Sequence, residues 1–192
     1  MARDAWDVSE AGNRSVMAWV KHNGELYDLY IGAEGGMRAG ESCKEMFAGY
    51  ASVKRITFNG VLHTDKTIDL SHMFICCVLL KELDLSSFDT TGVADMCSMF
   101  NCCTSLEKLN LSGFDTSEVA NMAGMFVGCR SLTELDLSSF DTSNVKNMSW
   151  MFEGCRSLTE LDLSSFDTSG VKNMETMFDG CPAGSQWQHL LH

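Results

Sequence analysis

Apolar residues recur along most of the chain at one fixed spacing. The dipeptide Met-Phe begins at five positions, each 26 residues after the last: Met73, Met99, Met125, Met151 and Met177. The segment Leu-Asp/Asn-Leu-Ser-x-Phe-Asp-Thr repeats with the same step and begins at Leu83, Leu109, Leu135 and Leu161. Self-similarity at a fixed period of this length is typical of repeat architectures. The chain therefore consists mainly of tandem 26-residue repeats.

A weaker copy precedes these repeats. Residues 46–58 align without gaps on residues 125–137, with other apolar residues in place of the leucines. We therefore place the array at residues 42–181, as about five coils of which the first is degenerate. Residues 1–41 then form an N-terminal region, and residues 182–192 form a C-terminal tail.

Each repeat predicts one strand and one short helix. In residues 132–155, the alternation of apolar and polar residues over 132–137 predicts a short strand with one buried face. Residues 141–144 favour a turn or a helix N-cap. Apolar residues at i, i+3 and i+7 then predict one face of a short helix over 145–152. Gly154 stands where a helix C-terminus favours a left-handed residue.

One such unit cannot fold alone. A single strand and helix bury too few side chains to offset the entropy lost on ordering 26 residues. Repeats of this kind stack so that neighbours share one core. The sequence therefore predicts an α/β repeat fold: a leucine-rich-repeat-type solenoid with one short parallel strand and one short helix per coil.

The two ends of the array differ from the repeats. Residues 16–22 and 25–31 flank an Asn-Gly pair, the strongest short hairpin signal. We therefore expect residues 1–41 to form a β-rich cap containing this hairpin. After residue 181 the motif breaks, and Gly184 stands where a leucine belongs. The apolar residues of the tail are expected to fold over the last coil, unless they belong to a truncated cap.

Charge and composition exclude several partners. The formal net charge is −12, which argues against binding to nucleic acid or to anionic lipid surfaces. No run approaches the ~18 apolar residues that a membrane span needs. The first residues, MARDAWDVSEAGNRS, have no apolar stretch typical of a secretory signal, so we expect none in this chain.

The repeat resembles a known family. The stretch LTELDLSSFDTSNVKNMSWMFEGC (132–155) and its copies resemble the BspA-like leucine-rich-repeat surface proteins built from a 26-residue repeat. The stretch WDVSEAGNRSVMAW (6–19) is similar to the segment that precedes such arrays. The resemblance implies a right-handed solenoid that is secreted or displayed on a bacterial surface. It also implies partners that are proteins or glycans of host or neighbouring cells.

The polar residues of each strand form the candidate ligand face. They alternate with the buried leucines and so point to solvent. They are Glu82, Asp84 and Ser86; Lys108, Asn110 and Ser112; Glu134, Asp136 and Ser138; and Glu160, Asp162 and Ser164. Solenoids bind along such repeated surfaces. The alternative is that these residues only keep an open sheet soluble.

Cysteines occupy two repeated positions. One column, expected to fill small buried slots in the core, contains Cys77, Cys103, Cys129, Cys155 and Cys181. Cys76 and Cys102 instead stand where other repeats have glycine. Neighbouring strands are about 4.8 Å apart, within reach of a disulfide. Three interpretations of this pair stay open: a Cys76–Cys102 disulfide, a soft-metal site, or drift at a position that prefers glycine.

A column of aspartates has two interpretations. It comprises Asp89, Asp115, Asp141 and Asp167. Carboxylates at this spacing can hold Ca²⁺, whereas an Asx-turn or N-cap role needs no metal. We expect the turn role.

Catalysis finds no support in the sequence. His63, Asp65, Asp69 and His72 share one coil without a motif-placed nucleophile. No phosphate-binding loop and no zinc-type Cys pair is present. We therefore expect no catalytic residues, no metal site and no cofactor.

Together these observations predict a non-enzymatic binding or adhesion module that presents its strand face to a protein or glycan. Two alternatives remain open. One is a structural spacer within a longer surface protein, and the other is a solenoid stabilised by calcium.

Overall fold

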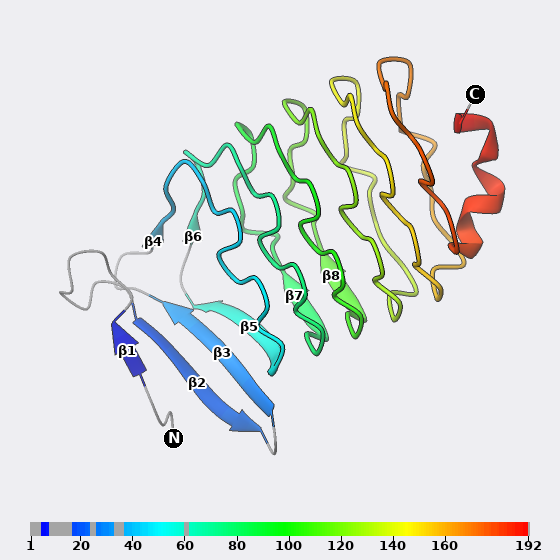
Figure 1. Cartoon of the computed structure of the whole chain (residues 1–192). Helices are drawn as coiled ribbons and strands as arrows, with labels where there is room; N and C mark the ends of the chain where they lie inside the picture. Colours follow the sequence, from blue (N-terminus) through cyan, green and yellow to red (C-terminus); the bar gives the residue numbers. More distant parts are fainter. Residues whose placement is uncertain (1–4, 8–16, 24–25, 33–36, 60–61, 192) are drawn as a thin grey trace.

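The computed structural model describes residues 5–7, 17–23, 26–32, 37–59 and 62–191. Its strands are β1 (Ala5–Asp7), β2 (Met17–Asn23), β3 (Leu26–Gly32), β4 (Met37–Arg38), β5 (Val53–Asn59), β6 (Leu62–His63), β7 (Glu82–Asp84) and β8 (Lys108–Asn110). One sheet has six strands in the order β1-β2-β3-β5-β7-β8, and β4 pairs with β6 in a second. Figure 1 shows the repeats lying side by side, with β7 and β8 drawn within them. We call the side-by-side repeats the stack.

The N-terminal strands form the hairpin that the sequence predicts. β2 and β3 pair antiparallel from Met17–Gly32 to Asn23–Leu26. The turn itself, at residues 24–25, lies outside the described residues. β3 then pairs in parallel with β5, so the hairpin extends the sheet of the repeats.

The next strands are parallel and in register with the repeat. Glu82 pairs with Lys108, and Leu83 pairs with Leu109, each 26 positions later. Equal positions of neighbouring repeats therefore lie beside each other, and single bridges such as Asn121–Asn147 align the later repeats in the same way. The strand predicted over residues 132–137 is wrong, because no strand is assigned there. The fold is a mostly parallel sheet with few helices, which is compatible with an α/β repeat.

The prediction of a short helix in each repeat is wrong. No helix is assigned between residues 62 and 181, and residues 149–154 are turns instead. Every second backbone N–H there bonds to the next repeat: Trp150 donates to the Glu175 carbonyl and Phe152 to the Met177 carbonyl, both at 2.9 Å. The intervening N–H groups close turns, as Met151 does onto Met148 at 3.2 Å. Hydrogen bonds therefore run between repeats rather than along a helix.

Backbone conformation explains why no helix forms. Two residues four positions apart have positive φ in each repeat, such as Trp150 (φ 58°) and Gly154 (φ 70°). A left-handed residue interrupts a right-handed helix. The same pair recurs as His72 with Cys76, Ser98 with Cys102, and Gly124 with Gly128.

The buried face predicted for this segment is nevertheless correct. Val145, Met148 and Phe152 are fully buried. The phenylalanines of successive repeats stack nearly in parallel, with ring centroids 5.3–5.7 Å apart and planes 4–11° apart. The column runs through Phe47, Phe74, Phe100, Phe126, Phe152 and Phe178. The inclusion of Phe47 places the degenerate first copy in the same core.

A second internal column is polar. The side chains of Thr90, Thr116 and Thr142 are buried. The Thr116 hydroxyl donates to the Asp141 carbonyl at 2.9 Å and accepts from the Asp141 N–H at 2.8 Å. Each threonine thus joins its own repeat to the next and satisfies both backbone groups of one residue.

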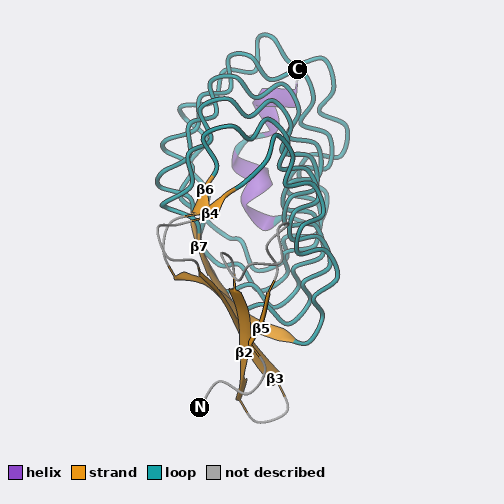
Figure 2. Ribbon diagram, turned by 90° about the vertical axis from the view of Figure 1, so that its left-hand side faces the viewer, coloured by secondary structure: helices purple, strands orange, loops and turns teal. Residues whose placement is uncertain are grey.

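The C-terminal tail covers the interior of the last repeat. It forms two 3₁₀ helices, η1 (Pro182–Gln186) and η2 (Gln188–Leu191). The Ala183 N–H donates to the Leu158 carbonyl at 3.0 Å, and the Trp187 indole N–H donates to the Leu161 carbonyl at 2.7 Å. Viewed along the stack, both helices lie across its interior (Figure 2). The tail therefore folds over the last repeat, whereas the boundaries at residues 41 and 181 stay predictions.

None of the helices in the described part of the chain has the length and apolar character to cross a lipid bilayer.

Candidate binding groove

An open groove follows the strand side of the stack. It has a volume of about 870 Å³. Its walls come from β5, β7 and β8 and from residues 134–136 and 160–162, which are the matching segments of the next two repeats. The groove therefore crosses five successive repeats, of which the first three contribute strands.

The groove contains most of the predicted ligand face. Nine of the twelve predicted residues line it: Glu82, Asp84, Ser86, Lys108, Asn110, Glu134, Asp136, Glu160 and Asp162. The other three, Ser112, Ser138 and Ser164, are exposed but do not line it. Sequence reasoning missed Arg55, Thr57 and Ser87, which also line the groove. Arg55 and Thr57 belong to the degenerate copy, where the repeat motif is hard to read.

Charges of both signs lie at the N-terminal end of the groove. The Arg55 guanidinium pairs with the Glu82 carboxylate at 3.0 Å. Lys108 lies directly opposite Glu82 on the neighbouring strand. Both partners of the Arg55–Glu82 pair are nearly half exposed, so the pair adds little to stability. A charged ligand could therefore replace the Arg55–Glu82 ion pair at little cost in stability.

The C-terminal end of the groove is acidic. Four carboxylates line it, those of Glu134, Asp136, Glu160 and Asp162, and the lining there includes no Lys or Arg. Like charges at equal positions of neighbouring repeats repel each other. Cations or hydrogen-bond donors from a ligand would relieve this repulsion.

The aspartates of the groove also have a structural role that sequence reasoning missed. One oxygen of Asp84 accepts from the Ser86 N–H at 3.0 Å, and Asp136 accepts from Ser138 at 2.9 Å. Asn110 and Asp162 make the same bond to the serine two positions later. Hydrogen bonds from Ser138 hold the pKa of Asp136 below its usual range. The Asp-x-Ser spacing, typical of an Asx turn, is the signal that could have found this role.

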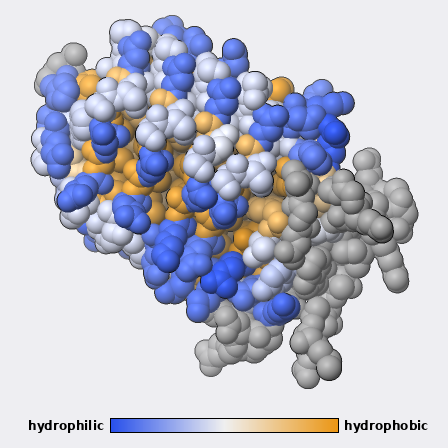
Figure 3. Space-filling view, turned by 180° about the vertical axis from the view of Figure 1, so that it is seen from behind, coloured by the Kyte–Doolittle hydropathy of each residue, from blue (hydrophilic) through white to orange (hydrophobic). Residues whose placement is uncertain are grey.

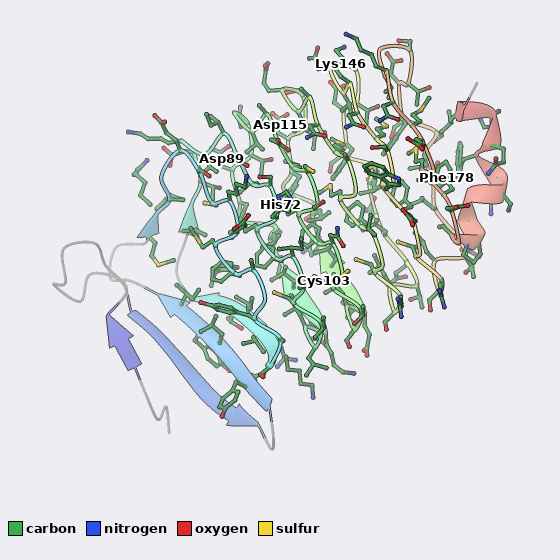
Figure 4. The ribbon with its side chains drawn as sticks, viewed as in Figure 1. His72, Asp89, Cys103, Asp115, Lys146 and Phe178 are labelled. Carbon is green, nitrogen blue, oxygen red and sulfur yellow. The ribbon has the colours of Figure 1, made fainter. Side chains whose placement is uncertain are left out.

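The predicted Asx-turn role of the outer aspartate column is confirmed. Asp89 accepts from both the N–H and the hydroxyl of Thr91, at 3.1 and 2.7 Å. Asp115 makes the same two bonds to Ser117. Figure 4 shows Asp89 and Asp115 along one edge of the stack. Among the described residues, no three His, Cys, Asp or Glu side chains are grouped so that they could hold one metal ion.

The cysteine column is buried, as predicted. The Cys103 thiol donates to the Phe74 carbonyl of the preceding repeat at 3.1 Å, and Cys155 bonds to Phe126 in the same way. Burial raises the pKa of Cys77 to about 11 and that of Cys155 to about 12. These thiols therefore stay protonated near neutral pH. Cys76 and Cys102 are free thiols in this structure, and a disulfide between them stays one of the open interpretations.

Asp65 and Asp69, which share a coil with His63 and His72, make separate local contacts. Asp65 pairs with Arg38, and Asp69 accepts from the Ser71 N–H at 2.8 Å. Nδ1 of His72 is buried without a hydrogen-bond partner among the described atoms. This arrangement does not join a nucleophile to a general base. The absence of catalysis stays a prediction.

Apolar residues also reach the surface. Viewed from behind, rows of polar residues flank apolar residues that run across successive repeats (Figure 3). The groove itself includes Ile56, Phe58 and Leu109 beside its charged residues. Its chemistry suits a ligand that offers both apolar contacts and cations or hydrogen-bond donors.

Comparison with known proteins adds one finding. A family model described as "Mycoplasma protein of unknown function, DUF285" matches residues 41–135 and, in an overlapping match, residues 68–188. Searches of the curated proteins and of the solved structures find no match. The family match spans the repeats and begins at the degenerate first copy.

Proposed function

The chain belongs to the DUF285 family, and from this premise we propose that it is a non-enzymatic binding module of the BspA-like type. In this proposal the stack is a right-handed leucine-rich-repeat-type solenoid. The in-register pairing of β7 with β8, 26 residues apart, supports that architecture. Display at a cell surface or secretion, and a partner on host or neighbouring cells, belong to the same proposal and rest on the resemblance of the repeat.

The observation that carries the proposal is the groove along the strand side of the stack. Nine polar residues from four repeats, predicted from alternation alone, line one continuous surface. Extended surfaces of stacked repeats commonly bind proteins and glycans. The groove has a mixed-charge end at Arg55, Glu82 and Lys108 and an acidic end at Glu134 and Glu160. This asymmetry favours a basic peptide segment, or a glycan bound through its hydroxyls, at the acidic end.

The test should change the glutamates and leave the aspartates intact. Glu134 and Glu160 are exposed, whereas Asp136 and Asp162 also hold turns. The double variant Glu134→Lys/Glu160→Lys therefore alters the charge of the groove without removing an Asx turn. We expect it to lose at least tenfold in affinity for its best ligand on a printed glycan array and a library of Lys- and Arg-rich peptides.

A matched control keeps the net charge equal. Glu118 and Glu175 are exposed glutamates outside the groove lining. The double variant Glu118→Lys/Glu175→Lys should bind as the unaltered protein does. Equal losses in both double variants would contradict a role for the groove.

A structural spacer is the second candidate. It is favoured by the turn bonds of Asp84, Asp136 and Asp162, which explain these residues without a ligand. If the protein is a spacer, we expect no saturable binding to the glycan array or to the peptide library. We also expect the Glu134→Lys/Glu160→Lys variant to change stability alone.

A further inference from the structure

Two cysteines occupy a position that the backbone reserves for glycine. Cys76 and Cys102 have φ values of 59° and 61°, in the left-handed region. The same slot in the other repeats is filled by Gly49, Gly128, Gly154 and Gly180, with φ of 68–72°. L side chains adopt this conformation at a cost. Two adjacent repeats thus carry a cysteine with a strained backbone at a position where glycine would fit without strain.

The slot brings neighbouring repeats close together. The Cys76 N–H donates to the Asn101 carbonyl at 2.8 Å, which fixes Cys76 against the repeat that carries Cys102. One repeat further on, a Cβ built on Gly128 would lie 3.9 Å from both Cα and Sγ of Cys102. Residues paired across parallel strands are about 4.8 Å apart, inside the Cα range of about 4.4–6.8 Å for disulfides. A similar spacing between Cys76 and Cys102, one repeat earlier, would fall within the range of a disulfide.

The side chains of Cys76 and Cys102 are less buried than those of the core cysteines. Cys76 is exposed and Cys102 is partly buried, whereas the five cysteines of the core column are buried. Cys97, the other partly buried cysteine, contacts the Ser98 hydroxyl at 3.7 Å. Small oxidants can therefore reach this pair more easily than they can reach the buried thiols.

We propose that Cys76 and Cys102 form a reversible redox clamp, a disulfide that links two neighbouring repeats when the protein meets a peroxide. The exposed Cys76 thiol loses its proton, and the resulting thiolate attacks one peroxide oxygen as the O–O bond breaks. Cys76 becomes a sulfenic acid, and the departing hydroxide takes up a proton and leaves as water. The Cys102 sulfur then attacks the Cys76 sulfur, the S–S bond forms, and the hydroxyl departs as a second water with the Cys102 proton. Two thiols are oxidised and one peroxide is reduced to two waters.

The order of these steps follows from exposure. Desolvation raises the pKa of Cys102, and the adjacent Cys76 raises it further. Less of Cys102 is thiolate than in an unperturbed cysteine, so it suits the second, resolving step. A dithiol reductant reverses the clamp by thiol–disulfide exchange.

The clamp should have a measurable effect on thermal stability. It closes a loop of about one repeat, which restricts the unfolded chain. We expect the oxidised protein to melt about 5–10 °C above the reduced protein. Neither Cys76 nor Cys102 lines the groove.

The experiment counts thiols after mild peroxide treatment. The full chain is treated with stoichiometric hydrogen peroxide, alkylated, and analysed by mass spectrometry and non-reducing peptide mapping. We expect the nine thiols of the reduced protein to fall to seven, with one Cys76–Cys102 peptide and full recovery after dithiothreitol.

Three variants make the test specific. C76G and C102G install the residue that other repeats carry in this slot, so both variants should fold. Neither variant should form a disulfide under the same peroxide treatment. C97S installs the serine found at Ser71 and Ser149 and should still form the clamp. A Cys76 disulfide to Cys77 or Cys97, a disulfide between two molecules, or sulfinic acid at Cys76 beside a free Cys102 would overturn the proposal.

Discussion

At the scale of single residues, short polar side chains connect the repeats and shape their turns. Asx bonds occur at three positions of a repeat, for example at Asp84, Asp89 and Asp95, each to the N–H two residues later. Only the second of these positions was recognised as a turn from sequence. The polar residues that look most available for ligands are therefore partly committed to the backbone, and the glutamates are the freer groups.

The buried threonines give the first prediction. Thr116→Val keeps the volume of the side chain but removes the hydroxyl that bonds both backbone groups of Asp141. Leaving buried partners unsatisfied costs about 1–3 kcal/mol. We expect the free energy of unfolding, measured by urea denaturation, to fall by about that amount.

Thr133→Val provides the matched control, because Thr133 is exposed. Its unfolding free energy should stay within about 0.5 kcal/mol of that of the unaltered protein. Equal effects of the two substitutions would show that the Thr116 hydroxyl has no special role.

The left-handed glycines give the second prediction. Gly154 has φ 70°, and an added Cβ would meet only ordinary contacts, 3.6 Å from Gly128. Gly154→Ala should therefore destabilise through backbone strain alone, by about 1 kcal/mol in urea denaturation. Gly92, whose φ is not positive and whose Cβ would have room, is the control. A loss in Gly92→Ala as large as that in Gly154→Ala would argue against strain as the cause.

At the scale of elements, the sequence predicts which residues are buried better than how the chain is folded. Val145, Met148 and Phe152 were correctly placed in the core because their slots repeat. The helix was wrong because the i, i+3, i+7 spacing also fits consecutive turns that bond to the next repeat. The deciding signal is two left-handed residues four positions apart. Gly124 and Gly128 display it, but Trp150 hides it in the next repeat.

The groove was predictable for a different reason. Strand alternation alone placed Glu134, Asp136 and their counterparts on one face, and the in-register pairing of repeats aligned that face into a surface. The turn bonds of the aspartates were missed because alternation describes the direction of a side chain and not its partners. Arg55 was missed because its repeat is degenerate.

The turn after each strand gives the third prediction. Hydrogen bonds from Ser138 lower the pKa of Asp136, and bonds from Ser164 lower that of Asp162. A carboxylate with a lowered folded-state pKa stabilises the protein above its unfolded value, near 3.8, and loses that effect as pH falls further. We therefore expect the melting temperature to drop as pH falls below about 4.

Substitution separates the turn bond from the charge. Asp136→Asn/Asp162→Asn keeps an acceptor oxygen for each serine and should show a smaller loss of melting temperature between pH 5 and about pH 3. Asp136→Ala/Asp162→Ala removes the acceptors and should melt lower at every pH. An acid transition unchanged in the asparagine variant would rule out these two carboxylates as a cause.

At the scale of the whole molecule, charge repulsion accumulates along the stack. The net charge is −12, and equal positions of successive repeats lie side by side. Glu134 and Glu160 therefore occupy equal positions of neighbouring repeats, and no lysine or arginine lines that part of the groove. A stack of near-identical repeats multiplies any unfavourable contact, and the Lys108 and Asn110 of one repeat interrupt the acidic column.

This repulsion gives the last prediction, which also tests calcium stabilisation. The outer aspartates are occupied by turn bonds, and the described residues show no three-carboxylate group that could hold an ion. EDTA should therefore leave the melting temperature unchanged at constant ionic strength. Added NaCl should raise it, because salt screens like charges within about a Debye length, roughly 10 Å at 0.1 M. Ca²⁺ and Mg²⁺ at equal concentration should act alike, since screening depends on charge and not on coordination geometry. A fall in melting temperature on chelation that Ca²⁺ reverses and Mg²⁺ does not would instead establish a specific calcium site and contradict the turn-only role of the aspartates.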